Sequence, residues 1–255
     1  MQLRILGCSG GIGQQARTSS YLVDDDILLD AGTGVGDLPL DEMRKISHIF
    51  ITHSHLDHVA TIPLLVDTLF SDIKQPVIVH ALQETIDALK KHIFNWTIWP
   101  DFTELPDKES PVLKFEVMKV GEVIELNGRS IEMIEVNHIV PAVGYVVKTR
   151  DAVFAYSGDT TTNNTLWPVL NRYPRLDFLV IESGFANHDI ELAHLARHYC
   201  PSLLAEDLKK LNHKPRIGIS HLKPGEEQLI MDECRVAFGN DWELHQLSSG
   251  DVFQL

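Results

Sequence analysis

The sequence feature that most restricts the fold is a short apolar run that ends directly in a cluster of metal-ligand side chains. Residues 47–58 read Ser-His-Ile-Phe-Ile-Thr-His-Ser-His-Leu-Asp-His. The run predicts a buried strand, and His53, His55, Asp57 and His58 follow its carboxyl end. Alternating side-chain direction and then a helical turn would separate them into two sets around two adjacent cations. A mere surface patch of histidines would require the strand, the aspartate and the histidine spacing to coincide by chance.

Short runs rich in Val, Ile, Leu and Phe recur along the whole chain and are separated by Gly, Asp, Asn and Pro. They predict strands at residues 2–6, 20–23, 26–30, 47–52, 76–80, 113–117, 122–127, 130–136, 143–148, 152–156, 177–182, 215–219 and 243–247. Helical spacing of apolar residues predicts helices at 61–70, 83–94, 188–199, 201–212 and 224–238. Strands followed by helices, twice over and with hairpins between, favour an α/β sandwich over a purely parallel sheet. No repeat or linker divides the chain, so we expect one domain over residues 1–255.

The charge balance argues against a long polyanion as the partner. Lys and Arg number 22 against 36 Asp and Glu, a formal net charge of −14 that repels nucleic acid unless basic residues cluster. Cys8, Cys200 and Cys234 have no Cys-x-x-Cys spacing and indicate neither a disulfide framework nor a thiolate zinc site. The amino terminus lacks a secretory apolar region, and no run approaches the roughly 20 apolar residues of a membrane span. We therefore expect a cytoplasmic protein with no membrane partner.

The motif His-Ser-His-Leu-Asp-His resembles the His-x-His-x-Asp-His signature of the metallo-β-lactamase superfamily, and the resemblance extends over almost the whole chain. It implies a four-layer αββα sandwich. It also implies a complete set of ligands for two metal ions: His53, His55 and His138 for one, Asp57, His58 and His221 for the other, and Asp159 as the bridge. Asp30 ends an early predicted strand and matches a further acidic residue of the family. We expect Asp30 to support the metal loop through hydrogen bonds without touching metal.

Such a ligand set suits hydrolytic chemistry. Two divalent ions roughly 3.5–4 Å apart can share a hydroxide at neutral pH and clamp a phosphoryl or carbonyl oxygen. Imidazole and carboxylate ligands suit Zn²⁺, and Mn²⁺ or Fe would also be accepted. The resemblance therefore implies a metal-dependent hydrolase with two divalent ions as cofactors and Zn²⁺ as the expected metal.

A second segment resembles one branch of the superfamily, the class II 3′,5′-cyclic-nucleotide phosphodiesterases. Residues 92–100 read His-Ile-Phe-Asn-Trp-Thr-Ile-Trp-Pro, and a similar segment follows the metal motif in that family. Trp96, Trp99 and Phe102 would offer aromatic faces to a purine base, an interaction worth about 1–3 kcal/mol per base in nucleic-acid sites. The alternative is that these rings pack the loop onto the core or onto a second subunit of a homodimer.

A third segment resembles the phosphodiesterase and ribonuclease Z branches, in which a glutamate at a strand end orients a histidine from the following helix. By position, Glu182 in Val-Ile-Glu-Ser-Gly would hold His198, and His198 would protonate the leaving alkoxide. A sugar alkoxide leaves poorly at neutral pH, so a positioned acid is needed. The alternative for His198 is an ordinary histidine on a helix surface.

Together these resemblances imply hydrolysis of the 3′-ester bond of a 3′,5′-cyclic nucleotide, such as cyclic AMP or cyclic GMP, to a 5′-nucleotide. A hydroxide held by the two metals would attack phosphorus, Asp57 would orient it, and His198 would protonate the leaving oxygen. The nearest alternative is a ribonuclease Z-like nuclease for tRNA 3′ processing, or another phospho- or sulfo-ester hydrolase of this fold. Residues 95–111 contain one Lys and four acidic residues, which weighs against RNA. An iron oxidoreductase of this fold would leave the second ligand set incomplete.

Overall fold

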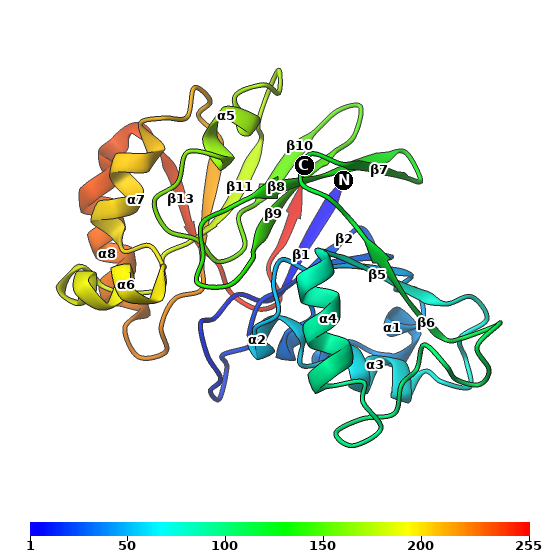
Figure 1. Cartoon of the computed structure of the whole chain (residues 1–255). Helices are drawn as coiled ribbons and strands as arrows, with labels where there is room; N and C mark the ends of the chain where they lie inside the picture. The colour runs from blue at the N-terminus through cyan, green and yellow to red at the C-terminus, as the bar shows by residue number, and fades with distance from the viewer.

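Two seven-stranded sheets stand face to face in the computed structural model, which describes residues 1–255, and helices cover their outer faces (Figure 1). The strand order is β14-β1-β2-β3-β4-β5-β6 in one sheet and β13-β12-β11-β10-β9-β8-β7 in the other. Both sheets mix parallel and antiparallel neighbours. The arrangement confirms the predicted α/β class and the four-layer αββα sandwich.

Every strand predicted from the sequence coincides with an observed strand to within two residues at each end. The strands are β1 (Gln2–Gly7), β2 (Ser20–Val23), β3 (Ile27–Leu29), β4 (His48–Phe50), β5 (Val77–Ala81), β6 (Leu113–Val117), β7 (Val123–Leu126), β8 (Arg129–Glu135), β9 (Val143–Lys148), β10 (Val153–Tyr156), β11 (Phe178–Glu182), β12 (Arg216–Ser220), β13 (Glu243–Gln246) and β14 (Val252–Gln254). The helices are α1 (Leu40–Met43), α2 (Leu56–Val59), α3 (Ile62–Thr68), α4 (Gln83–His92), α5 (Leu166–Leu170), α6 (Ile190–Ala196), α7 (Pro201–Leu208) and α8 (Glu227–Phe238). The sequence patterns do not predict β14, α1, α2 or α5.

Three predicted helix ends extend too far. The helix α6 ends at Ala196 because the next residue, Arg197, adopts left-handed backbone angles (φ 55°, ψ 52°). The helix α7 ends at Leu208, where the sequence pattern predicts an end at residue 212. The helix α8 begins only after Gly225, whose φ of 93° belongs to a turn and not to a helix.

The sheet topology brings the predicted site residues to one end of the sandwich. The strands β3 and β4 are parallel neighbours, and β10, β11 and β12 form a parallel set in the other sheet. Parallel neighbours end at the same edge of a sheet, so the loops after them lie side by side. The loops after β4, β10 and β12 carry the histidine cluster of residues 53–58, Asp159 and His221, respectively.

Apolar side chains fill three layers of this fold. Between the sheets, buried aromatic rings meet, and Phe50 packs edge-on against Tyr145 with 5.5 Å between ring centroids. Outside, Trp167 lies in the core that joins the second sheet to α5, α7 and α8, and Leu89 lies in the core that joins the first sheet to α3 and α4. The hydrophobic stretch that a bilayer crossing requires is missing from every helix of the structure.

His80 on β5 is a buried titratable side chain in the layer between the sheets. Its ring stacks on Phe50 with 4.4 Å between ring centroids, and its Nε2 lies 3.0 Å from Nδ1 of His48. Burial, and then repulsion from His48, lowers the pKa of His80 from 6.5 to about 4. The unfolded chain therefore binds this proton more readily, and the contribution to stability, present above pH 6.5, is lost as the pH falls toward 4.

We expect His80→Gln to reduce the acid sensitivity of folding. Between pH 7 and pH 5, protonation at His80 should lower the free energy of unfolding of the wild-type chain by on the order of 1–2 kcal/mol. The variant has no group at this position that takes up a proton, so this decrease in the free energy of unfolding should be absent. Its amide keeps a polar group near His48. Urea unfolding at both pH values measures the difference, with the exposed His92→Gln as the control. An equal drop in wild type and His80→Gln would contradict the prediction.

Candidate metal centre

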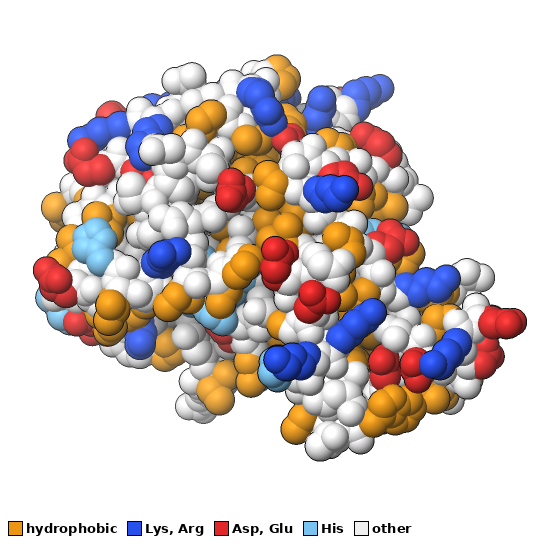
Figure 2. Space-filling model, viewed as in Figure 1, with side chains coloured by type: hydrophobic (Ala, Val, Ile, Leu, Met, Phe, Trp, Pro, Cys, Tyr) orange, Lys and Arg blue, Asp and Glu red, His pale blue; other side chains and the backbone are white.

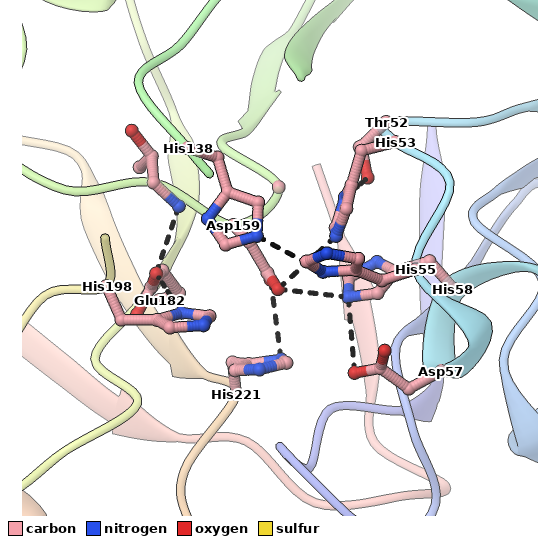
Figure 3. Close-up of polar contacts among 12 residues, drawn as sticks. Thr52, His53, His55, Asp57, His58, His138, Asp159, Glu182, His198 and His221 are labelled. Atoms are coloured by element: carbon pink, nitrogen blue, oxygen red, sulfur yellow. Dashed lines mark hydrogen bonds and ion pairs between the residues drawn. The ribbon is translucent and has the colours of Figure 1, made fainter. Parts of the chain in front are cut away.

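Ligand-type side chains from both sheets converge at one end of the sandwich (Figure 3). Their donor atoms form two groups of four, within each of which all atoms lie within 4.8 Å of one another: His53, His55, His138 and Asp159 in one, and Asp57, His58, Asp159 and His221 in the other. Asp159 also lies within that distance of Glu182 and His198. Asp159 lies between the histidines of the two groups and belongs to both. The structure thus brings together the two sets expected from the sequence.

The chemistry of this cluster fits divalent cations. Nε2 of His53, Nε2 of His58 and Nδ1 of His221 are buried and have no hydrogen-bond partner. All three nitrogens face the Asp159 carboxylate, at 3.6, 3.3 and 3.4 Å, respectively. Buried polar atoms are rarely left without a partner. A cation bound between these three nitrogens and the carboxylate would accept their lone pairs.

Burial and charge hold three of the imidazoles and the Asp159 carboxylate in the forms that bind cations. Burial lowers the pKa of His53 well below its usual value and lowers the pKa values of His55 and His138. Burial opposes the charge on Asp159, but His221 and His58 hold its pKa well below the usual value. Burial also opposes the charge on His58, but the carboxylates of Asp159 and Asp30 raise its pKa well above the usual value. Imidazole ligates metal in its neutral form, so a cation bound here would have to displace the proton of His58.

Asp30 supports the cluster through hydrogen bonds, as expected, and belongs to neither of the two donor groups. Its Oδ2 accepts a hydrogen bond from Nδ1 of His58 at 2.7 Å. The Thr52 hydroxyl donates a hydrogen bond to Asp30 at 2.8 Å, and the Thr52 hydroxyl oxygen itself lies 2.9 Å from Nδ1 of His53. A carboxylate only accepts, so these contacts place the protons on Nδ1 and leave Nε2 of both rings free for a cation. The hydroxyl of Tyr156 also donates to Asp30, at 2.8 Å.

Glu182 and His198 form a pair at the edge of the cluster. Nδ1 of His198 lies 2.7 Å from Oε1 of the buried Glu182. The same Oε1 accepts a hydrogen bond from the main-chain N–H of Thr160, and Oε2 accepts one from the main-chain N–H of Gly184. Burial disfavours the charged ring, but the Glu182 carboxylate raises the pKa of His198 to about 9. The ring stacks on His221 with 5.1 Å between centroids and an interplanar angle of 11°. Glu182 therefore favours the protonated form of His198 next to the two donor groups.

The location of His198 differs from the expectation. The sequence pattern predicts a helix through residue 199, but His198 lies in the turn after α6, two residues beyond its end. The helix ends early because Arg197 is left-handed, and this turn points the His198 ring toward Glu182.

The aromatic segment after α4 provides fewer exposed rings than expected. Phe102 is buried against Phe70, with 5.8 Å between ring centroids, so it offers no face to a ligand. This finding corrects its expected role in stacking. Trp99 is half-buried against the same core, and only Trp96 is exposed. The apolar surroundings, and not a ligand, hold two of the three rings.

The cluster opens to solvent on one side. The Asp57 side chain is 32% exposed, His198 is 13% exposed and His221 is 10% exposed, whereas His53 and His58 are fully buried. Histidine is visible in the hollow between the two halves of the molecule, with hydrophobic side chains around it (Figure 2). Leu56 and Ile139, which directly follow His55 and His138 in the chain, are both exposed.

A large cavity lies next to the cluster but does not contain it. Its volume is about 920 Å³, and glutamine and serine side chains are prominent in its lining. Cys8 and Leu222 belong to its wall, and the Cys8 carbonyl accepts the main-chain N–H of His221 at 2.6 Å. No residue of the two donor groups lines the cavity.

Two facing mixed sheets with a histidine and aspartate cluster beyond their strand ends define a metallo-β-lactamase fold. The chain belongs to the β-lactamase superfamily, because the sequence model of the β-lactamase superfamily domain matches residues 26–235. Unliganded yeast PDE1 has the same fold, with a TM-score of 0.82 and 18% sequence identity over 99% of both chains.

Two relatives indicate the neighbouring branches of the family. A probable 3′,5′-cyclic-nucleotide phosphodiesterase of Yersinia pestis is 29% identical over 228 residues, which cover 78% of this chain and 64% of that protein. A ribonuclease Z of Halorubrum lacusprofundi is 30% identical over 161 residues, which cover 59% of this chain and 49% of that protein. The chain thus spans less than two thirds of the length of both relatives.

Proposed function

We propose that this chain is a metal-dependent phosphodiesterase that hydrolyses 3′,5′-cyclic nucleotides to 5′-nucleotides. The observation that carries the proposal is the Glu182–His198 pair, in which the carboxylate holds the imidazole beside the two donor groups and raises its pKa. The leaving group of a cyclic nucleotide is a sugar alkoxide, and it needs such an acid. The name of the Yersinia pestis relative supports the same substrate class.

The two donor groups would hold two divalent ions, of which Zn²⁺ fits the imidazole-rich set, and Mn²⁺ or Fe are the alternatives. When bound, the ions supply Lewis-acid polarisation of the phosphoryl group and acidify water. Asp30 and Thr52 hold the rings of His53 and His58 with their Nε2 atoms toward the ions. Leu56 and Ile139, which follow His55 and His138 in the chain, are exposed and would provide apolar surface that suits the ring of a nucleobase.

Asp57 has a second task in this proposal. It is the most exposed carboxylate of the cluster, and its Oδ2 lies 3.5 Å from Nε2 of His58. The oxygen that does not bind a cation would accept a hydrogen bond from the attacking water and align it with phosphorus.

We expect Asp57→Asn to lower kcat by about 10²–10³-fold and to lower metal content much less. The amide retains one oxygen for the cation, but its NH2 group cannot accept a hydrogen bond from the attacking water. Metal analysis of the purified variant, beside steady-state kinetics, checks this. The matched control is Asp67→Asn, an exposed aspartate on α3. Loss of activity in proportion to the loss of metal would remove the separate role of Asp57.

The function itself is tested with purified protein loaded separately with Zn²⁺, Mn²⁺ and Fe²⁺. Each form is incubated with cyclic AMP and with cyclic GMP, and the 5′- and 3′-nucleotide products are separated. We expect the 5′-nucleotide. The absence of turnover with both substrates and all three metals would reject the proposal, and 3′-nucleotide as the product would reject the assigned bond.

A ribonuclease Z-like activity is the second candidate, and the relative from Halorubrum lacusprofundi favours it. The segment of residues 95–111 contains Asp101, Glu104, Asp107 and Glu109 but only one Lys, so it repels a polyanion. Cleavage of a tRNA precursor, compared with hydrolysis of bis-p-nitrophenyl phosphate by the same preparation, distinguishes the two candidates.

A further inference from the structure

Arg197 connects His138 to His198 and has an unusual backbone. It follows the last residue of α6 with φ 55° and ψ 52°, in the left-handed region that favours glycine. The main-chain N–H of His198 donates to the Ala193 carbonyl at 2.9 Å, which closes the end of the helix. Glycine would adopt this conformation without strain. An arginine at this position therefore lowers the stability of the fold unless contacts of its side chain offset the backbone strain.

The side chain and the main chain of Arg197 both bind His138. The Arg197 carbonyl oxygen lies 3.0 Å from Nδ1 of the His138 ring, and Nη1 of Arg197 donates to the His138 carbonyl at 2.7 Å. A carbonyl only accepts, so Nδ1 of His138 carries the proton. Nε2 therefore keeps its lone pair, and it lies 3.2 Å from Nδ1 of His55 in the donor group.

Arg197 also sets the place of the next residue. His198 follows it by one peptide bond and donates to Glu182. The rings of His138 and His198 meet at 67° with 4.9 Å between centroids. A shift of the Arg197 backbone would therefore move both rings.

We propose that Arg197 is a positioning residue that aligns the metal ligand His138 with His198. The alignment of His198 rests on the proposed function, whereas the hold on His138 is independent of the substrate. The strained backbone turns the Arg197 carbonyl toward the His138 ring, and the guanidinium fixes the main chain of the same histidine. Residues that support a metal ligand in this way typically change metal affinity or activity about 10–100-fold when they are removed.

The test compares Arg197→Gly and Arg197→Asn with Asn127→Gly. Glycine and asparagine both tolerate the left-handed backbone but lack the guanidinium. Asn127 has φ 50° in the turn between β7 and β8, so Asn127→Gly is a matched control for relief of backbone strain. Co²⁺ binding to the metal-free full-length chain is followed by its visible absorption and by competition with a chelator. We expect both Arg197 variants to bind one of two Co²⁺ ions about 10–100-fold more weakly, with no loss of thermal stability in Arg197→Gly.

Kinetics with saturating metal provide the second measurement. With cyclic AMP, we expect kcat of the Arg197 variants to fall while KM stays nearly unchanged, because His198 is no longer aligned. With bis-p-nitrophenyl phosphate, whose leaving group needs no proton, kcat should stay near that of the wild type once metal is saturating. Affinity for both Co²⁺ ions equal to that of the wild type in either folded variant would overturn the proposal. This result does not depend on cyclic nucleotides, so a failure of the proposed function would be recognised separately by the product assay. If Arg197→Gly does not fold, Arg197→Asn decides.

Discussion

Replacement of His198 by asparagine is expected to lower kcat for cyclic AMP about 10²–10⁴-fold, the usual contribution of a positioned general acid. The same variant should hydrolyse bis-p-nitrophenyl phosphate at nearly the wild-type rate. The two substrates differ in their leaving groups: p-nitrophenolate departs without a proton, whereas the sugar alkoxide requires one. The ratio of the two kcat values therefore measures the contribution of proton donation, because any loss of activity that affects both substrates equally divides out.

A structural role for His198 would produce another pattern. If its ring only supported His221, on which it stacks, both substrates would lose activity equally. The control is His194→Asn, an exposed histidine on α6 that is not in the cluster. Metal content is measured for each variant. An equal loss on both substrates in a fully loaded His198→Asn protein would exclude proton donation by His198.

The strands were predictable from the sequence because each is a local pattern. A run such as residues 113–117 alternates apolar and charged side chains and needs no partner to be recognised. The helices α1, α2 and α5 have four or five residues, too few to show a helical period. The early end of α6 depends on one left-handed arginine, a residue type with no preference for that conformation.

The site was predictable to the extent that it follows a motif. Residues 53–58 lie together in the sequence, and the resemblance to a family supplies the distant members of the cluster, His138, Asp159 and His221. The supporting contacts are not local: Tyr156 donates to Asp30 across 126 positions, and Arg197 donates to His138 across 59. Which aromatic ring is exposed also depends on packing, so the sequence does not separate buried Phe102 from exposed Trp96. Such pairings are decided by the tertiary fold.

The Asp30→Asn variant should show how far the metal centre depends on such a distant contact. Asp30 is fully buried with φ 58°, and asparagine keeps both its shape and its tolerance of that backbone. Its carboxylate accepts hydrogen bonds from His58, Tyr156, the Thr52 hydroxyl and the Thr52 main-chain N–H. In the variant, the NH2 group of asparagine would face at least one of these donors, which would then lose its acceptor.

We expect Asp30→Asn to lower the free energy of unfolding by about 3 kcal/mol, because a buried donor is left without an acceptor. We also expect a 10–100-fold loss of metal affinity, because the tautomers of His53 and His58 are no longer fixed. Urea unfolding of the metal-free chain and a chelator competition measure the two effects separately. Asp24→Asn is the matched control, since Asp24 is also left-handed (φ 54°) but lies in the turn between β2 and β3. If Asp30→Asn bound metal as tightly as Asp24→Asn, the orientation of His53 and His58 would have to come from the cations themselves.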